Sequence, residues 1–218
     1  MFEKFSDASG IIFDCDGTLL DSMKAWRHVE FSLIDMTGVT WTQEMLEHMR
    51  AAAMSEACRI FHEDYGVMDS NEDIRRYMEQ TMCDYYENKA EFRPGAREFF
   101  WRLRGLGIPC SVVSSTPARY LRPAMEHVGI IDELAALIST EESGLSKQDP
   151  AIYKLALDKM GAEIPTAWGF EDSLYAIRVM GGMGISTVGC YEDDDSGTFE
   201  ELQENATIAV RSFEELLV

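Results

Sequence analysis

The side chains best suited to chemistry are two aspartates, Asp14 and Asp16, which directly follow the apolar run Gly10–Phe13. In an extended chain, residues two apart project from the same face, so a small tetrahedral group has room between or beside the two carboxylates. Crowded carboxylates repel one another, and the usual remedy is a bound hard cation. With oxygen ligands only, the cation this pattern indicates is Mg²⁺.

Other polar clusters follow other apolar runs. Taken alone, each has a plainer interpretation: a helix cap for the Ser and Thr residues, a solvated surface lysine, or an acidic pair at a helix N-terminus. The Asp14–Gly17 segment taken alone is likewise an ordinary Asp-x-Asp-Gly turn. Ligands of open parallel sheets bind beyond the carboxyl ends of the strands, and all of these clusters fall at that edge of the predicted sheet. Their conjunction therefore indicates one site. The clusters are Ser114-Ser115-Thr116, Lys147, and Glu171-Asp172-Ser173.

Short apolar strands alternate with helices over the second half of the chain, and this alternation predicts an α/β fold. The strands are too apolar for a surface sheet, so we expect a Rossmann-like, doubly wound parallel sheet covered by helices on both faces. The predicted strands are Gly10–Phe13, Pro109–Val113, Ala135–Ile138, Thr166–Phe170, Ile185–Val188 and Ile208–Val210. The predicted helices are Ala96–Arg104, Tyr120–Val128, Ile152–Met160, Leu174–Met180 and Phe213–Leu216.

A helical segment separates the first strand from the rest. Between Met23 and Lys89 the apolar residues recur at intervals of three and four, which is typical of amphipathic helices. We therefore predict an all-helical domain at 22–90 inserted into a core formed by 1–21 and 91–218. Candidate capping boxes are Thr40 with Gln43 and Ser70 with Asp73.

Composition limits the classes of partner. The 218 residues are 46% hydrophobic and carry 19 Lys and Arg against 39 Asp and Glu, a formal charge of -20. Without a basic patch, this charge disfavours nucleic acid and anionic membranes. The five cysteines form no C-x-x-C pair and are expected to be reduced thiols. With no signal peptide and no bilayer-length apolar run, we expect a cytoplasmic protein, a monomer or a weak homodimer.

These residues resemble the motifs of the haloacid dehalogenase superfamily of phosphohydrolases, in particular the branch of β-phosphoglucomutase and phosphoglycolate phosphatase. The resemblance covers nearly the whole chain. The third motif departs slightly, with Gln148 where proline is usual and Ala151 where an acid is usual. The matching segments are Ile11 to Ser22 for the first motif, Ser114 for the second, Lys147-Gln148-Asp149-Pro150 for the third, Gly169-Phe170-Glu171-Asp172-Ser173 for the fourth, and Arg93-Pro94-Gly95 for the return from a helical cap into the core.

The resemblance implies a role for each motif residue. Asp14 would be the nucleophile that forms an aspartyl-phosphate, and Asp16 the general acid and base. Lys147 would offset the charge shared by the phosphate and Asp14. The resemblance also implies that Mg²⁺ is bound by Asp14, by the backbone carbonyl of Asp16, by Asp172, and by Glu171 directly or through water. The phosphoryl oxygens would be held by Ser114, Lys147 and the backbone amides of Gly17, Thr18 and Ser115.

In such a family the inserted helical domain is a C1 cap that contacts the leaving group, so substrate identity would reside there. His48 and Arg50 are candidate specificity residues, because their stretch often faces the active site in relatives. The predicted function is hydrolysis of a small phosphorylated metabolite, a sugar phosphate or a phosphoglycolate-like acid.

Other activities of the superfamily fit less well. Mutases carry a cap histidine at the position that Trp26 occupies here. Phosphonatases carry a lysine in the middle of the cap, whereas the lysines of this segment, Lys24 and Lys89, lie at its ends. Dehalogenases generally lack the second aspartate of the first motif, which is Asp16 here. A hexose phosphate mutase stays open as an alternative. A non-enzymatic binding protein on the same fold is a second one, although Asp14, Asp16, Lys147 and Asp172 are all present.

Overall fold

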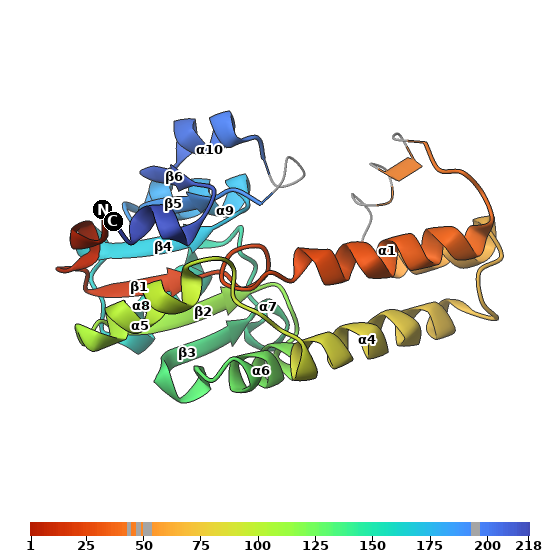
Figure 1. The fold of residues 1–218 in the computed structure, drawn as a ribbon, viewed down its shortest axis with the longest axis horizontal. Helices are drawn as coiled ribbons and strands as arrows, with labels where there is room; N and C mark the ends of the chain where they lie inside the picture. Colours follow the sequence, from red (N-terminus) through yellow and green to blue (C-terminus); the bar gives the residue numbers. More distant parts are fainter. Residues whose placement is uncertain (43–44, 47–48, 50–53, 193–196) are drawn as a thin grey trace. The chain divides into compact units, whose positions relative to one another are not determined.

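A single sheet of six parallel strands forms the centre of the fold in this computed structural model, which describes residues 1–42, 45–46, 49, 54–192 and 197–218. The strand order is β3-β2-β1-β4-β5-β6, so β1 is central (Figure 1). Both the parallel sheet and its Rossmann-like winding confirm the predicted fold class. The strands are β1 (Gly10–Phe13), β2 (Cys110–Ser114), β3 (Leu134–Ser139), β4 (Ala167–Glu171), β5 (Ser186–Cys190) and β6 (Ile208–Val210).

Helices cover both faces of this sheet, as predicted. On one face, Ile12 of β1 packs in a buried cluster with Ile152 and Ala156 of α8 and with Met180 of α9. The helices of this part of the chain are α5 (Ala96–Gly105), α6 (Ala118–His127), α7 (Thr140–Ser143), α8 (Pro150–Met160), α9 (Leu174–Met183) and α10 (Phe199–Asn205).

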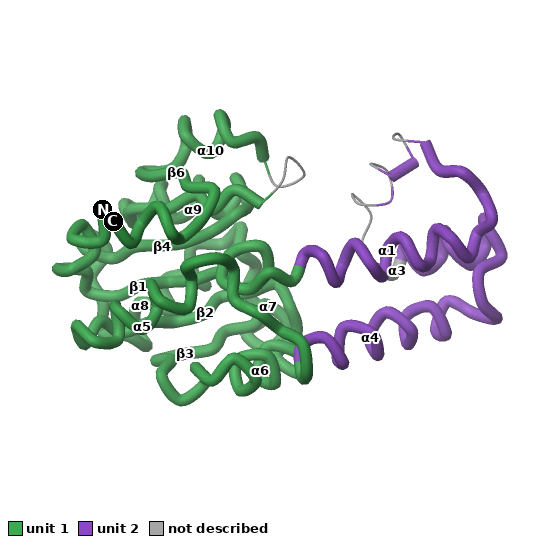
Figure 2. The backbone as a smooth tube through the Cα atoms, in the orientation of Figure 1, with its two compact units in different colours: residues 1–22, 87–218 green, residues 23–86 purple. Residues whose placement is uncertain are grey.

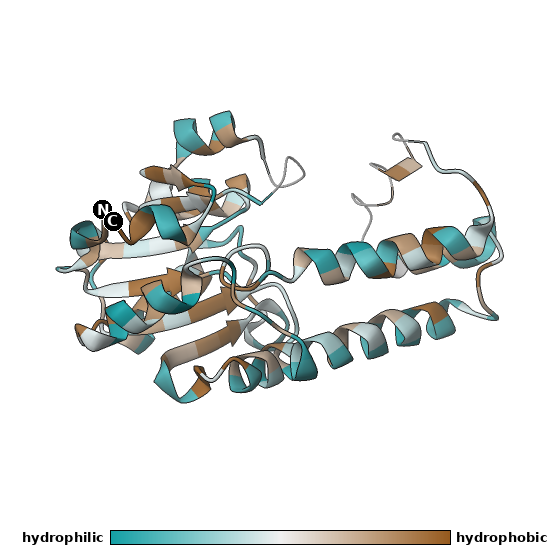
Figure 3. Cartoon of the chain, viewed as in Figure 1, coloured by the Kyte–Doolittle hydropathy of each residue, from teal (hydrophilic) through white to brown (hydrophobic). Residues whose placement is uncertain are grey.

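Aromatic side chains fill the opposite face. Phe13 of β1 lies 4.9 Å from Phe170 of β4, measured between ring centroids, and Phe170 stacks on Phe213 at 5.5 Å. Figure 3 shows the strands as largely hydrophobic ribbons between helices of mixed character. Successive side chains of β1 therefore reach opposite layers of the core.

Some element bounds differ from the sequence predictions. Strand β2 begins at Cys110 instead of Pro109, and the predicted helix Phe213–Leu216 is a 3₁₀ helix. The 3₁₀ helix Phe2–Phe5 and the helices α7 and α10 were not predicted, because four to seven residues are too few for a periodic pattern.

The chain divides into two compact units, residues 1–22 with 87–218 and residues 23–86 (Figure 2). The second unit contains α1 (Met23–Thr37), α3 (Met54–Arg59), the π-helix Ile60–Asp64 and most of α4 (Asn71–Asn88). The Ser70 hydroxyl accepts a hydrogen bond from the Asp73 N–H at 3.1 Å, which confirms that helix start. Gln43, His48 and Arg50 lie outside the described residues. Among the helices of the described residues, none is both long and apolar enough to cross a membrane.

Candidate active site

The catalytic candidates sit where neighbouring parallel strands end. The register pairs Phe13 of β1 with Val112 of β2 and Phe170 of β4. The backbone N–H of Asp14 donates to the Phe170 carbonyl at 2.9 Å, so the residue after β1 is tied to the end of β4. Because all strands run in the same direction, the polar residues that follow them gather at one edge of the sheet.

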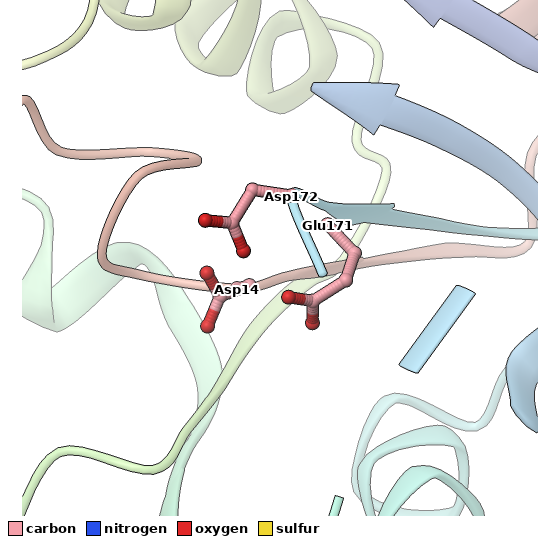
Figure 4. Close-up of side chains that lie close together, drawn as sticks. All are labelled: Asp14, Glu171 and Asp172. Carbon is pink, nitrogen blue, oxygen red and sulfur yellow. The ribbon is translucent and has the colours of Figure 1, made fainter. Parts of the chain in front are cut away.

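Three carboxylates meet at this edge. Asp14, Glu171 and Asp172 each offer an oxygen within 4.8 Å of the others, and all three residues are at most 6% exposed. Figure 4 shows Asp14 from the first motif and Glu171 with Asp172 from the fourth, their carboxylates gathered in one small region. The structure therefore brings the carboxylates of these two segments together at one edge of the sheet.

Lys147 supplies the positive charge at this cluster. Its ammonium group lies 2.7 Å from a carboxylate oxygen of Asp14 and 2.6 Å from one of Glu171, and only 4% of the residue is exposed. The Tyr153 hydroxyl donates to the Lys147 carbonyl at 3.0 Å and fixes the loop that carries the lysine. The substituted third motif, with Gln148 and Ala151, thus still delivers its lysine to the nucleophile candidate.

Burial and like charge shift the ionisation of the cluster. Loss of solvation, with repulsion from Asp172, raises the pKa of Asp14 to about 6 despite the opposing pull of Lys147. Burial and the neighbouring Asp14 also raise the pKa of Glu171 well above its usual range. Burial alone would lower the pKa of Lys147, but Asp14 and Glu171 raise it well above its ordinary value, so the lysine stays charged. The cluster holds more carboxylates than one lysine neutralises.

Asp16 is not among the three carboxylates of that group. Strand β1 ends at Phe13, and beyond Cys15 the chain turns, with the Leu19 N–H donating to the Cys15 carbonyl at 2.9 Å. The Asp16 carboxylate instead accepts hydrogen bonds from the Ser22 hydroxyl at 2.6 Å and the Thr116 hydroxyl at 2.7 Å. Two hydroxyls from different segments thus set the direction of this carboxylate.

We expect Thr116→Val to lower kcat about tenfold, the effect of one lost hydrogen bond to a charged group, while KM changes little. The substitution preserves side-chain shape but removes the donor to Asp16. Steady-state kinetics on an aryl phosphate measure it, with the exposed Thr166→Val as the matched control. An unchanged kcat would mean that the Asp16 orientation seen here does not matter for turnover.

Donors for an anionic oxygen surround the same edge. Thr18 is fully buried, and its hydroxyl has no hydrogen-bond partner among the described residues. The Ser114 hydroxyl accepts from the Thr116 N–H at 3.0 Å, which leaves its own proton to donate. The Gly17 N–H is engaged within the turn, donating to the Leu20 carbonyl at 3.1 Å. Of the two adjacent amides expected to hold a phosphoryl group, that of Thr18 is the one the turn leaves for a ligand.

A cavity of about 360 Å³ opens beside Lys147, and it is lined in part by Ser115, Gln148 and Tyr175. Sequence reasoning missed Tyr175, and it placed Thr116 in a polar cluster of the site without giving it a contact to Asp16. Neither position carries a sequence pattern of its own. Tyr175 lies near the start of α9, where the sequence gives no sign that it lines a cavity.

The donor set fits a divalent cation. Lys147 pairs with Asp14 and Glu171 of the three buried carboxylates, and carboxylate oxygens are the ligands that Mg²⁺ takes in proteins. Burial is the main cause of the raised pKa of Asp14, and a bound cation would offset the repulsion from Asp172 that adds to it. No nitrogen or sulfur ligand joins this cluster among the described residues, which disfavours zinc.

Known proteins resemble this chain over most of its length. The profile of the haloacid dehalogenase-like hydrolases matches residues 11–190. A phosphorylated carbohydrates phosphatase of Thermotoga maritima is 22% identical over 178 residues, 82% of each chain. A phosphoglycolate phosphatase of Yersinia pseudotuberculosis is 24% identical over 195 residues, 85% of this chain and 82% of that protein. The crystal structure of a β-phosphoglucomutase from Clostridium difficile superimposes with a TM-score of 0.66, at 18% identity, covering 96% of this chain and 93% of the other.

Proposed function

Because this chain belongs to the haloacid dehalogenase-like hydrolase family, we propose that it hydrolyses the phosphate ester of a small metabolite, a sugar phosphate or a phosphoglycolate-like acid, through an aspartyl-phosphate. The observation that carries the proposal is the buried Asp14 carboxylate, held by Lys147 at 2.7 Å beside Glu171 and Asp172. Relatives named as phosphatases, one of phosphorylated carbohydrates and one of phosphoglycolate, support a phosphoric monoester hydrolase.

The reaction divides into two displacements at phosphorus. First, a carboxylate oxygen of Asp14 attacks phosphorus, the bond to the ester oxygen breaks, and Asp16 gives its proton to that leaving oxygen. Then Asp16 takes a proton from a water molecule, the water oxygen attacks phosphorus, and the bond to Asp14 breaks to release inorganic phosphate. Ser114, Lys147 and the amides of Thr18 and Ser115 bind the phosphoryl oxygens throughout.

Asp14, Asp172 and Glu171 would hold Mg²⁺, with the backbone carbonyl of Asp16 as a further ligand. The cation supplies charge neutralisation, which lets an anionic phosphate approach an anionic nucleophile. Lys147 adds to this neutralisation from the side of Asp14 and Glu171, where its two ion pairs already place it. Every ligand in this proposal comes from the unit formed by 1–22 and 87–218.

We further propose that residues 22–90 act as the cap and that His48 and Arg50 contribute to the choice of leaving group. A mutase is the second candidate, because a β-phosphoglucomutase shares the fold. The phosphatase is favoured by Trp26, which occupies the position of the mutase histidine and whose indole N–H donates to the Tyr86 hydroxyl at 3.3 Å.

An assay of phosphate release separates the two activities. We expect the protein with Mg²⁺ to release inorganic phosphate from at least one of a panel of sugar phosphates, 2-phosphoglycolate and p-nitrophenyl phosphate, and EDTA to abolish the release. Ranking kcat/KM over the panel gives the substrate class. Isomerisation of a hexose phosphate that depends on a bisphosphate, without net phosphate release, would replace the phosphatase by the mutase.

Binding of Mg²⁺ should also raise the thermal stability of the protein, by an amount that depends on pH. The pKa of Asp14 is raised from 3.8 to about 6 in the folded protein, so the folded state binds more protons than the unfolded state between these values, and the free energy of unfolding falls as the pH rises through that window. Because Mg²⁺ binds the ionised carboxylates, we expect it to raise Tm more at neutral pH than in acidic buffer below the Asp14 pKa. Thermal unfolding with Mg²⁺ or EDTA at the two pH values measures this. Equal shifts at both would contradict a metal bound to Asp14.

A further inference from the structure

Arg93 is a buried arginine that ties together three segments distant in sequence. Only 8% of the residue is exposed. Its guanidinium donates to the carbonyl of Gly17 in the first motif, to that of Tyr191 after β5 at 2.7 Å, and to that of Arg211 after β6 at 3.4 Å. Glu192 lies 3.4 Å away as its counter-charge, and both side chains are at most 10% exposed.

The arrangement depends on the shape of the side chain. A guanidinium presents five N–H donors in a rigid plane, whereas a lysine ammonium is a compact point charge on a flexible stem. An arginine side chain can therefore donate hydrogen bonds to three carbonyls of different segments at once, which a lysine side chain is poorly shaped to do. Burying such a charge is unfavourable in free energy, and here the hydrogen bonds to the carbonyls and the carboxylate of Glu192 offset the loss of solvation.

The segment that carries Arg93 is itself firmly held. The Arg93 N–H donates to the Leu19 carbonyl at 3.0 Å, so the backbone and the side chain of one residue both bind the first-motif turn. Behind it, a Cβ atom built on Gly95 would lie 2.5 Å from the Glu214 nitrogen, which shows how closely this segment packs on the C-terminal 3₁₀ helix. Arg93 is thus a fixed anchor for that turn.

The contact with Gly17 bears directly on the phosphoryl site. The Gly17 carbonyl and the Thr18 N–H belong to one planar trans peptide unit, so they point in opposite directions, and holding the carbonyl sets the direction of the N–H. Gly17 has a φ of 75°, a conformation in which a turn without a second restraint could rotate this unit. No acceptor for the Thr18 N–H is found in the part of the chain that the structure describes.

We propose that Arg93 is a positioning residue for phosphoryl transfer, whose guanidinium holds the Gly17 carbonyl so that the Thr18 N–H is directed at the transferred phosphoryl oxygens. The inference rests on the proposed phosphatase function and adds to it a residue outside the four motifs. Arg93 touches neither substrate nor cation in this account; it acts through the backbone of Gly17 and Thr18.

The test compares Arg93→Lys and Arg93→Ala with Arg97→Ala, which removes an exposed arginine from the same segment. With p-nitrophenyl phosphate and Mg²⁺, we expect both Arg93 variants to lose about 10²-fold in kcat, the effect of removing one oxyanion donor, with KM little changed. Binding of orthovanadate, which mimics the pentacoordinate transition state, should weaken in parallel. Guanidinium chloride at concentrations far below denaturing should restore kcat to Arg93→Ala and not to Arg93→Lys.

A merely structural role predicts a different pattern: a lower Tm and fewer active molecules, but unchanged kcat and vanadate affinity per folded molecule. That pattern would overturn the proposal, as would a loss in Arg97→Ala equal to the loss in the Arg93 variants. Should Arg93→Ala fail to fold, Arg93→Lys alone decides through kcat and vanadate affinity. If the wild-type protein itself releases no phosphate, the proposed function fails first, so the two failures are distinguishable.

Discussion

Asp14→Asn is expected to lower phosphate release at least about 10⁴-fold, as the loss of a covalent nucleophile does in other enzymes. The amide keeps the shape of the carboxylate and can still accept a hydrogen bond from Lys147, but it cannot attack phosphorus. The measurement is kcat/KM for p-nitrophenyl phosphate with Mg²⁺, wild type against variant.

Measuring Tm beside kcat/KM distinguishes a loss of activity in Asp14→Asn from a loss of folded protein. Because burial raises the pKa of Asp14, its charge is unfavourable in the folded protein at neutral pH, so removing it should leave Tm unchanged or higher. Asp158→Asn, which alters an exposed carboxylate on α8, is the matched control and should behave as wild type. A loss of less than about tenfold in Asp14→Asn would show that another group carries the phosphoryl transfer.

Lys147→Met is expected to damage both activity and stability. Without the ammonium group, three buried carboxylates face one another with no cation between them. Breaking a buried ion pair from one side costs about 3–5 kcal/mol, or on the order of 10 °C in Tm for a chain of this size. Activity should fall at least about 10²-fold, because the charge of the phosphoryl group loses its fixed counter-charge.

The dependence of the Tm loss in Lys147→Met on pH and on Mg²⁺ shows whether the lost charge causes it. In Lys147→Met the pKa values of Asp14 and Glu171 rise further, because the lysine that lowers them is gone. Acidic buffer protonates these two carboxylates and should therefore narrow the difference in Tm between variant and wild type, and Mg²⁺ should narrow it as well. Lys154→Met removes an exposed lysine from α8 and should unfold as wild type does. A gap in Tm that is the same in acidic and neutral buffer, with or without Mg²⁺, would mean that Lys147 acts through packing and not through charge.

The central features of the fold could be predicted because each strand is a short apolar run followed by a polar turn. Gly10–Phe13 and Ile208–Val210 match β1 and β6 residue for residue. The parallel arrangement then brings Asp14 and Glu171 together, since strands that run in one direction end at one edge. Local pattern and topology were sufficient here.

Contacts between distant segments could not be predicted. The direction of Asp16 depends on hydroxyls of Ser22 and Thr116, 6 and 100 residues away, and the environment of Gly17 depends on Arg93, 76 residues away. Such contacts follow from how loops pack and leave no periodic trace in the sequence. The same holds for the short 3₁₀ helix Phe2–Phe5, whose Phe5 is fully buried against Phe99.

The most direct test of an aspartyl-phosphate at Asp14 is to trap it. In Asp16→Asn, with Mg²⁺ and p-nitrophenyl phosphate, the first displacement needs little protonation because nitrophenolate leaves readily, whereas the second lacks its base, so the phosphoenzyme should accumulate. Acid quenching, reduction with borohydride and peptide mass spectrometry should then find homoserine in place of aspartate at position 14, in an amount equal to the burst of nitrophenol. A nitrophenol burst with position 14 unmodified, or with the modification at another carboxylate, would contradict the assignment of Asp14 as the nucleophile.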